Sequence, residues 1–254
     1  MLNDRQLSAW NELELGPVFV SRAGPSSPEA PAAGAADAPS DAPAVAAADA
    51  PTGAPAADSW LRIREEVSGC RRCGLCESRR QTVFGSGSER ARWMLIGEAP
   101  GAEEDARGEP FVGQAGRLLE QMLAVVGLSR ADDVFITNVL KCRPPGNRNP
   151  EPLEAATCSG YLYRQIELLQ PDLILLLGRF AVQSVLKTDA SVGGLRRQVH
   201  TYRGTGGDIP VVCTYHPAYL LRNLPEKRKS WEDLCLAMDV AARQQALRAT
   251  RGRG

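Results

Sequence analysis

The chain has 254 residues with 30 basic and 30 acidic side chains, so its formal net charge is zero, and 43% of its residues are hydrophobic. No apolar run is long enough to span a bilayer, and the first residues lack the basic start and continuous apolar stretch of a signal peptide. We therefore expect a cytoplasmic protein without membrane contact. Its seven cysteines should stay reduced there, which favours metal binding or redox chemistry over disulfides.

Composition divides the chain into three parts. Residues 1–23 contain a short apolar segment with Trp10 and Phe19, which is either a docking peptide for a protein partner or a strand or helix that packs back on the domain. Residues 24–58 consist almost wholly of Ala, Pro, Gly, Ser and Asp, so we expect a disordered acidic linker. Residues 59–254 remain for one folded domain, which we expect to be a monomer.

The neutral total hides an uneven distribution of charge. Residues 1–58 contain eight acidic and two basic side chains, which leaves 22 acidic and 28 basic ones in the rest of the chain. The folded part therefore has an excess of six positive charges. Such a surface is compatible with a nucleic-acid partner, although many solvated protein surfaces have the same bias.

Short apolar runs alternate with helical patterns through the folded part. Continuous apolar sequence predicts buried strands over 93–96, 134–137, 173–177 and 211–214. Helical spacing predicts helices over 60–67, 116–126, 152–169, 179–186 and 231–247. This alternation predicts an α/β fold with a parallel sheet covered on both faces. In such sheets, ligands bind beyond the carboxyl ends of the strands.

Polar residues follow three of these strands. Residues 97–101, Gly-Glu-Ala-Pro-Gly, form a loop whose backbone amides can approach a ligand, although an ordinary strand-to-helix turn has a similar composition. Asn138 follows the second strand, and an amide side chain can read the edge of a nucleobase bidentately. His216 follows the fourth and is a candidate catalytic group, one of two histidines in the chain. We expect these side chains to converge at one edge of the sheet.

The cysteines indicate a metal centre. Cys70 and Cys73 form a local Cys-x-x-Cys turn, and Cys142 and Cys158 can reach it only through folding. Isolated buried thiols are the simpler alternative, but a turn that contains two arginines is a poor core segment. Spacing also admits Cys70, Cys73 and Cys76 as a ferredoxin-like run. Zinc is a weaker alternative because Cys142 and Cys158 do not form a second short knuckle.

Several segments together resemble the family 4 uracil-DNA glycosylases, the iron-sulfur branch of the uracil-DNA glycosylase superfamily. The resemblance covers roughly residues 70–237, in the order and spacing of that family, and is carried by the segments 97–101, 103–105, 110–116, 141–147 and 216–222. It implies a three-layer α/β/α domain around a central four-stranded parallel sheet. It also implies a [4Fe-4S] cluster held by Cys70, Cys73, Cys142 and Cys158, with no counterpart for Cys76.

The resemblance further implies the reaction and its residues. We expect hydrolysis of the N-glycosidic bond of uracil in single- or double-stranded DNA, giving free uracil and an abasic site for base excision repair. The implied catalytic residues are Glu98, Asn138 and His216, and the implied uracil-binding residues are Gly97, Ala99, Phe111, Asn138, Asn147 and His216. The expected DNA-binding residues are Leu220, Leu221, Arg222, Lys227 and Arg228, as apolar wedges and phosphate-neutralising cations, unless this charge run is only a solvated loop.

Two positions depart from the best-known branch of the superfamily. Ala99 replaces its water-activating Asp, so the activator is open, with Glu98 the adjacent carboxylate. Gly101 replaces the aromatic residue that excludes thymine, which leaves Glu104 as a candidate for that task. The alternative functions are a non-catalytic uracil-DNA binding protein and a branch that traps its product covalently. That branch carries a basic insertion, and residues 105–111 show none.

Overall fold

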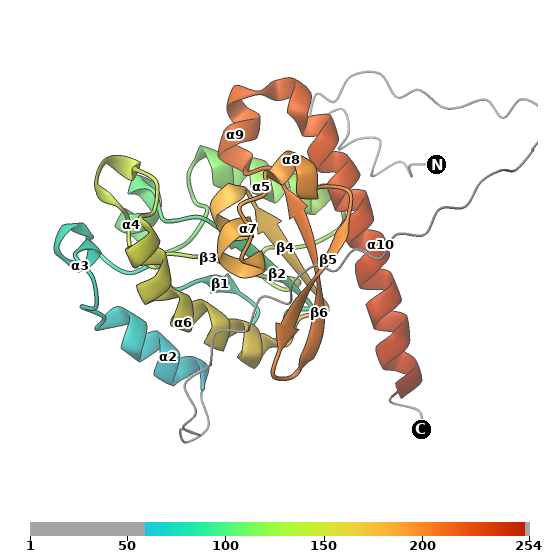
Figure 1. Ribbon diagram of the computed structural model, residues 1–254, viewed down its shortest axis with the longest axis horizontal. Helices are drawn as coiled ribbons and strands as arrows, with labels where there is room; N and C mark the ends of the chain where they lie inside the picture. The colour runs from blue at the N-terminus through green and yellow to red at the C-terminus, as the bar shows by residue number, and fades with distance from the viewer. Residues whose placement is uncertain (1–58, 252–254) are drawn as a thin grey trace, which may run out of the picture. The chain divides into compact units, whose positions relative to one another are not determined.

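A computed structural model describes residues 59–251 (Figure 1). The segments expected at 1–23 and 24–58 lie outside these described residues. Within residues 59–251, none of the helices combines the length and apolar character needed to cross a bilayer.

A six-stranded sheet with the order β1-β3-β2-β4-β6-β5 forms the centre of the fold. Its four inner strands run parallel and confirm the four predicted strands: β3 (Val134–Asn138), β2 (Trp93–Gly97), β4 (Leu173–Leu177) and β6 (Gly207–Thr214). The outer strands β1 (Ser86–Gly87) and β5 (Val199–Gly204) pair antiparallel to them. The expected number of four strands was therefore wrong for the whole sheet and right for its parallel centre.

Both outer strands lack the apolar run that identified the inner ones. β1 has only two residues, and β5 alternates between exposed and partly buried side chains because it lies at an edge. β5 continues into β6 through a tight hairpin at Thr205 and Gly206. A strand that is half exposed has a weaker hydrophobic signal than a strand covered on both faces.

Helices cover both faces of the sheet (Figure 1). The five predicted helices are observed close to their expected bounds, as α2 (Trp60–Ser68), α5 (Gln114–Val125), α6 (Pro152–Leu169), α7 (Arg179–Leu186) and α10 (Lys227–Arg251). The shorter elements were not predicted, and they are α3 (Leu75–Ser78), α4 (Ala102–Arg107), α8 (Val192–Leu195), α9 (Pro217–Arg222) and the 3₁₀ turns η1 (Pro145–Asn147) and η2 (Leu224–Glu226). One or two turns are too short for helical periodicity to establish.

Alternate side chains of each inner strand enter different cores. In β2, Met94 and Ile96 pack with α2, α6 and α7, whereas Trp93 and Leu95 pack with α5, α9 and α10. All four of these β2 side chains are almost fully buried. This arrangement confirms the expected three-layer α/β/α fold. It leaves the carboxyl ends of the strands as the edge where loops can form a site.

Candidate active site and cysteine cluster

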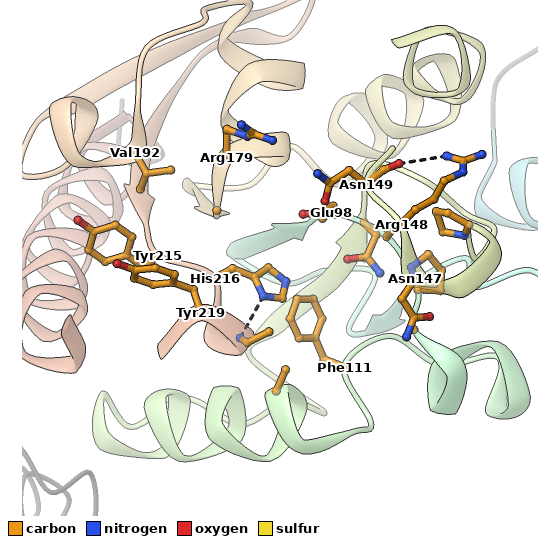
Figure 2. Close-up of a pocket in the computed structure, with 18 of the residues that line it drawn as sticks. Glu98, Phe111, Asn147, Arg148, Asn149, Arg179, Val192, Tyr215, His216 and Tyr219 are labelled. Carbon is orange, nitrogen blue, oxygen red and sulfur yellow. Dashed lines mark hydrogen bonds between the residues drawn. The ribbon is translucent and has the colours of Figure 1, made fainter. Parts of the chain in front are cut away.

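A cavity of about 660 Å³ lies at the carboxyl ends of the inner strands (Figure 2). The loops after β2, β3, β4 and β6 all contribute to its lining. Among the site residues predicted from the sequence, it is lined by Glu98, Ala99, Phe111, Asn138, Asn147, His216 and Arg222. The remaining ones, Gly97, Leu220, Leu221, Lys227 and Arg228, are not part of the lining.

Several lining residues were missed at the sequence level. Arg179 lies two residues after the end of β4, so the strand-exit reasoning used for the other strands would have found it. Tyr215 and Tyr219 flank His216 and also line the cavity. Arg148 lies in the loop before α6, where no sequence signal pointed to it.

Gly97 and Asn138 are paired neighbours at the ends of β2 and β3. A Cβ atom on Gly97 would lie 2.4 Å from the Asn138 Oδ1 and 2.6 Å from the Phe111 ring, so glycine is what leaves room for both side chains. Asn138 is 2% exposed, and its Oδ1 has no hydrogen-bond partner within the part of the chain that the structure describes. An unmatched buried acceptor costs about 1–3 kcal/mol, which favours a site for a ligand that donates a hydrogen bond.

Phe111 forms an aromatic wall of the cavity. Its backbone φ of +55° is in the left-handed region, which a bulky residue rarely adopts. The ring is nearly buried and stacks on His216, with 5.4 Å between ring centroids and 28° between ring planes (Figure 2). Such a backbone costs on the order of 1–3 kcal/mol and persists only where its surroundings hold it.

His216 is the residue that precedes α9. Its Nδ1 accepts a hydrogen bond from the Ala218 backbone N–H at 3.1 Å (Figure 2). Burial and the positive charge of Arg222 lower the pKa of His216 to about 4, against a smaller opposing effect of Glu104. The imidazole is therefore neutral at physiological pH. Since Nδ1 acts as an acceptor, the proton of the neutral ring is on Nε2, which makes that nitrogen a donor.

Glu98 is a partly buried carboxylate at the end of β2. Burial raises its pKa, and the nearby positive charge of Arg179 offsets part of that effect. A carboxylate with a raised pKa is a stronger base than an exposed one, so its environment suits proton transfer.

Glu104, the other carboxylate in the cavity lining, is engaged by backbone groups. Its Oε1 accepts hydrogen bonds from the Val112 and Gly113 N–H groups, both at 3.0 Å, and its Oε2 accepts one from Gly101 at 3.1 Å. Both oxygens are thus used to connect two loops. This arrangement does not favour the expected task of excluding a methyl group.

The loop between β3 and α6 forms one rim of the cavity. Asn147 is exposed, has a left-handed φ of +56°, and accepts a hydrogen bond from the Arg143 Nε at 2.7 Å. Arg148 forms two hydrogen bonds with Glu154 of α6, at 2.9 and 2.6 Å. These contacts hold the rim in a defined conformation.

The two leucines after His216 have different environments. Leu220 is 1% exposed and belongs to the core formed by α5, α9 and α10, so its expected role as an apolar wedge in DNA is not compatible with its place in this structure. Leu221 is 39% exposed. On a single turn of helix, adjacent residues point in different directions, which a pair of leucines in sequence does not reveal. Lys227 and Arg228 start α10, and Arg228 is exposed.

A second cavity brings the cysteines together. It is lined by Cys70, Cys73, Cys76, Cys142 and Cys158, all of which are free thiols. Within residues 59–251, no group of three His, Cys, Asp or Glu side chains is arranged to hold a single metal ion. A [4Fe-4S] cluster has a different requirement, because each of its four thiolates binds a separate iron and the sulfurs surround a space instead of meeting at one point.

Two hydrogen-bond donors contact these sulfurs. The Arg79 guanidinium donates to the Cys142 Sγ at 2.9 Å, and the Lys141 backbone N–H donates to the Cys158 Sγ at 3.4 Å. Burial raises the pKa of Cys142 to about 11 and also raises the pKa of Cys158. Thiolates at these positions need positive charge and N–H donors nearby. A bound cluster would supply the charge, and the protein supplies the donors.

Known proteins are similar to this chain over about two thirds of its length. The profile of the "Uracil DNA glycosylase superfamily" matches residues 84–236. A "Type-4 uracil-DNA glycosylase" of Archaeoglobus fulgidus is 44% identical over 174 residues, which cover 67% of this chain and 86% of that protein. One of Saccharolobus solfataricus is 46% identical over 176 residues, covering 67% and 81%. A "Type-5 uracil-DNA glycosylase" of Pyrobaculum aerophilum is less similar, at 32% over 170 residues, covering 61% and 73%.

Proposed function

Because the chain belongs to the uracil-DNA glycosylase superfamily, we propose that it is a DNA-repair hydrolase that cleaves the N-glycosidic bond of uracil in DNA. Free uracil and an abasic site are the products. The observation that carries this proposal is the buried, unpartnered Oδ1 of Asn138 beside the Phe111 ring, in a cavity at the ends of the strands.

Asn138 and Phe111 would bind the extruded base. An enzyme that acts on a base in DNA must take it out of the stack, and stacking on an aromatic ring replaces part of the lost interaction. The Asn138 Oδ1 would accept the N3–H of uracil, while its amide nitrogen donates to O4. Cytosine has an acceptor at N3 and a donor at C4, so it would leave both groups of the buried amide unmatched.

His216 would stabilise the leaving group. As the C1′–N1 bond breaks, both electrons stay with uracil, and negative charge develops on its carbonyl oxygens. The neutral Nε2–H donor is held in orientation by the Nδ1 contact with Ala218, so it needs no rearrangement during the reaction. A donor aimed at developing charge is typically worth on the order of 100-fold or more in rate.

Glu98 is our candidate for the residue that acts on water. Of the two carboxylates that line the described cavity, Glu104 already accepts three backbone hydrogen bonds. That leaves Glu98, whose pKa is raised by burial, to orient the water and to take its proton as the water oxygen bonds to C1′.

Asn147 would contact the substrate through its amide nitrogen, because its Oδ1 accepts a hydrogen bond from the Arg143 side chain.

DNA would approach the cavity, whose lining includes Arg179 of α7 and Arg222 of α9. Both arginines line the cavity, and basic side chains there would neutralise phosphates next to the extruded nucleotide. Tyr219 and Leu221 are exposed on α9 close by, where apolar surface could fill the gap in the duplex. Lys227 and Arg228 remain candidates for more distant phosphate contacts.

Cys70, Cys73, Cys142 and Cys158 are our proposed ligands for a [4Fe-4S] cluster. They line one cavity, and two of the sulfurs accept hydrogen bonds from protein N–H groups, as expected for cluster ligands. When bound, the cluster would cross-link the segment before α3, the loop after β3 and helix α6. Cys76 lines the same cavity, so comparison of Cys76→Ala with Cys73→Ala would test which thiol is the ligand.

The proposed activity can be tested directly. Purified full-length protein is incubated with an end-labelled oligonucleotide that contains one uracil, and abasic sites are then cleaved with alkali. We expect cleavage at the uracil position, and none with thymine or cytosine in its place. A cluster-loaded protein that gives no cleavage at stoichiometric enzyme would contradict the enzyme function, while a stable cross-link to the uracil strand would indicate product trapping instead of turnover.

A further inference from the structure

Hydrogen bonds to the residues that follow Phe111 hold its left-handed backbone. Glu104 of α4 accepts the N–H groups of Val112 and Gly113, both at 3.0 Å, through one carboxylate oxygen. The other oxygen accepts the N–H of Gly101 at 3.1 Å. One side chain thus connects the loop after β2 with the peptide units that follow Phe111.

Arg130 holds the same segment through the carbonyl groups of Pro110 and Phe111. Its guanidinium donates to the Phe111 carbonyl oxygen at 2.7 Å and also donates to the Pro110 carbonyl oxygen. Glu109 and Glu120 each lie 3.2 Å from the guanidinium, so its orientation is determined by ion pairs on two sides. The two carbonyl groups next to the Phe111 side chain are therefore fixed by one charged group.

The start of α5 packs closely against the same peptide unit. A Cβ atom on Gly116 would lie 1.8 Å from the Phe111 carbonyl oxygen, so the helix packs directly against this peptide unit. Contacts from α4, from Arg130 and from α5 all act on four consecutive residues, 110–113. The unfavourable φ of Phe111 is held by these contacts together, and its ring lies against His216 as a consequence (Figure 2).

We propose that Glu104 and Arg130 are positioning residues that hold Phe111 ready to stack on the extruded uracil, an inference that rests on the proposed function. Without these contacts the backbone can relax to an ordinary φ, and the ring no longer forms the cavity wall. A preformed stacking surface avoids the cost of ordering the ring during binding. This assigns Glu104 a role in base affinity in place of exclusion of the thymine methyl group.

Binding to a non-cleavable substrate separates this role from catalysis. The probe is a single-stranded oligonucleotide with one 2′-fluoro-2′-deoxyuridine, whose glycosidic bond resists hydrolysis. Glu104→Gln puts an amide NH₂ where one oxygen accepts backbone N–H groups, so we expect the Kd to rise about tenfold or more, in line with loss of a charged hydrogen bond. The matched control is Glu103→Gln, because Glu103 is exposed on the same helix and its ion-pair distance to Arg107 is 4.0 Å. The Kd of this variant for the probe should stay within about twofold of the wild-type value.

A double-mutant cycle identifies the route of the effect. If Glu104 acts through Phe111, then Glu104→Gln should change the Kd by less than about twofold when Phe111 is already Ala. Equal losses of affinity in both backgrounds would overturn the positioning role. Arg130→Lys keeps the charge but lacks the two-pronged donor, so it should show the same pattern and provides a second test if Glu104→Gln does not fold.

Failure of this inference can be told apart from failure of the proposed function. Wild-type protein that excises uracil but shows additive effects would contradict only the role of Glu104 and Arg130. Wild-type protein that neither excises uracil nor prefers the fluorinated uracil probe over a thymine probe would contradict the proposed function itself.

Discussion

Gly97→Ala is expected to abolish most of the uracil excision while leaving the fold in place. The added Cβ would lie 2.4 Å from the Asn138 Oδ1 and 2.6 Å from the Phe111 ring, whereas ordinary contacts begin at 3.4 Å, so the two side chains must retreat by about 1 Å. A misplacement of about 1 Å in a catalytic site can cost on the order of 100-fold in rate. We therefore expect kcat/KM to fall by about 100-fold, equivalent to about 2.7 kcal/mol of transition-state stabilisation.

The assay is the initial rate of uracil release from a single-stranded oligonucleotide, together with the melting temperature of each variant. Gly97 does not have a positive φ, so alanine is compatible with its backbone, and the displaced side chains can move toward the cavity. Gly160→Ala is the matched control, since beyond its chain neighbours and the surrounding backbone of α6 no described atom lies within 4 Å of the position of its added Cβ. Nearly wild-type activity of Gly97→Ala would mean that Asn138 and Phe111 do not form the base pocket.

Three further predictions concern His216, the cysteines and the leucines of α9. The pKa of His216 falls from 6.5 to about 4 on folding, so the unfolded chain takes up the proton first and the free energy of unfolding decreases as the pH falls through that window. Between pH 7.5 and 5, the free energy of unfolding of His216→Gln, measured with urea, should therefore decrease by about 2 kcal/mol less than that of wild type. An equal decrease in both proteins would contradict the buried neutral imidazole. Cys142→Ala should yield a colourless protein with reduced iron content and a lower melting temperature, and unchanged iron would exclude Cys142 as a ligand. Leu220→Ala should lower the free energy of unfolding by about 2–5 kcal/mol, because Leu220 is buried in the core. Leu221→Ala should leave the free energy of unfolding nearly unchanged and weaken duplex-DNA binding. The reverse pattern would contradict the buried position of Leu220 and the exposed position of Leu221.

The parallel centre of the fold could be predicted because its signals are local. Each inner strand is a continuous apolar run that is buried on both faces, and each long helix shows its own periodicity. β5 has neither property, since it lies at an edge with one side partly exposed, and its pairing with β6 is visible only in the folded sheet. Positions at the ends of parallel strands follow from topology, which is why Glu98, Asn138 and His216 could be expected to meet.

The environment of a site residue could not be predicted in the same way. Leu220 and Leu221 are identical in sequence, and only the packing of α9 against α5 and α10 makes one of them core and the other surface. The acceptors and donors around Phe111 come from Glu104 and Arg130, which are respectively seven residues before it and 19 residues after it. No spacing rule connects these residues to the ring.

The α/β architecture, the family resemblance, the residues at the strand exits and the candidate cluster ligands could all be predicted from the order of residues along the chain. These properties depend on periodicity and on the order of residue types along the chain. Three other properties arise only when the chain folds: the neutral, Nε2-protonated state of His216, the left-handed backbone of Phe111 and the unmatched Oδ1 of Asn138. Each of these depends on burial and on distances of a few ångströms between segments that are far apart in sequence, and such distances exist only once the segments have packed together.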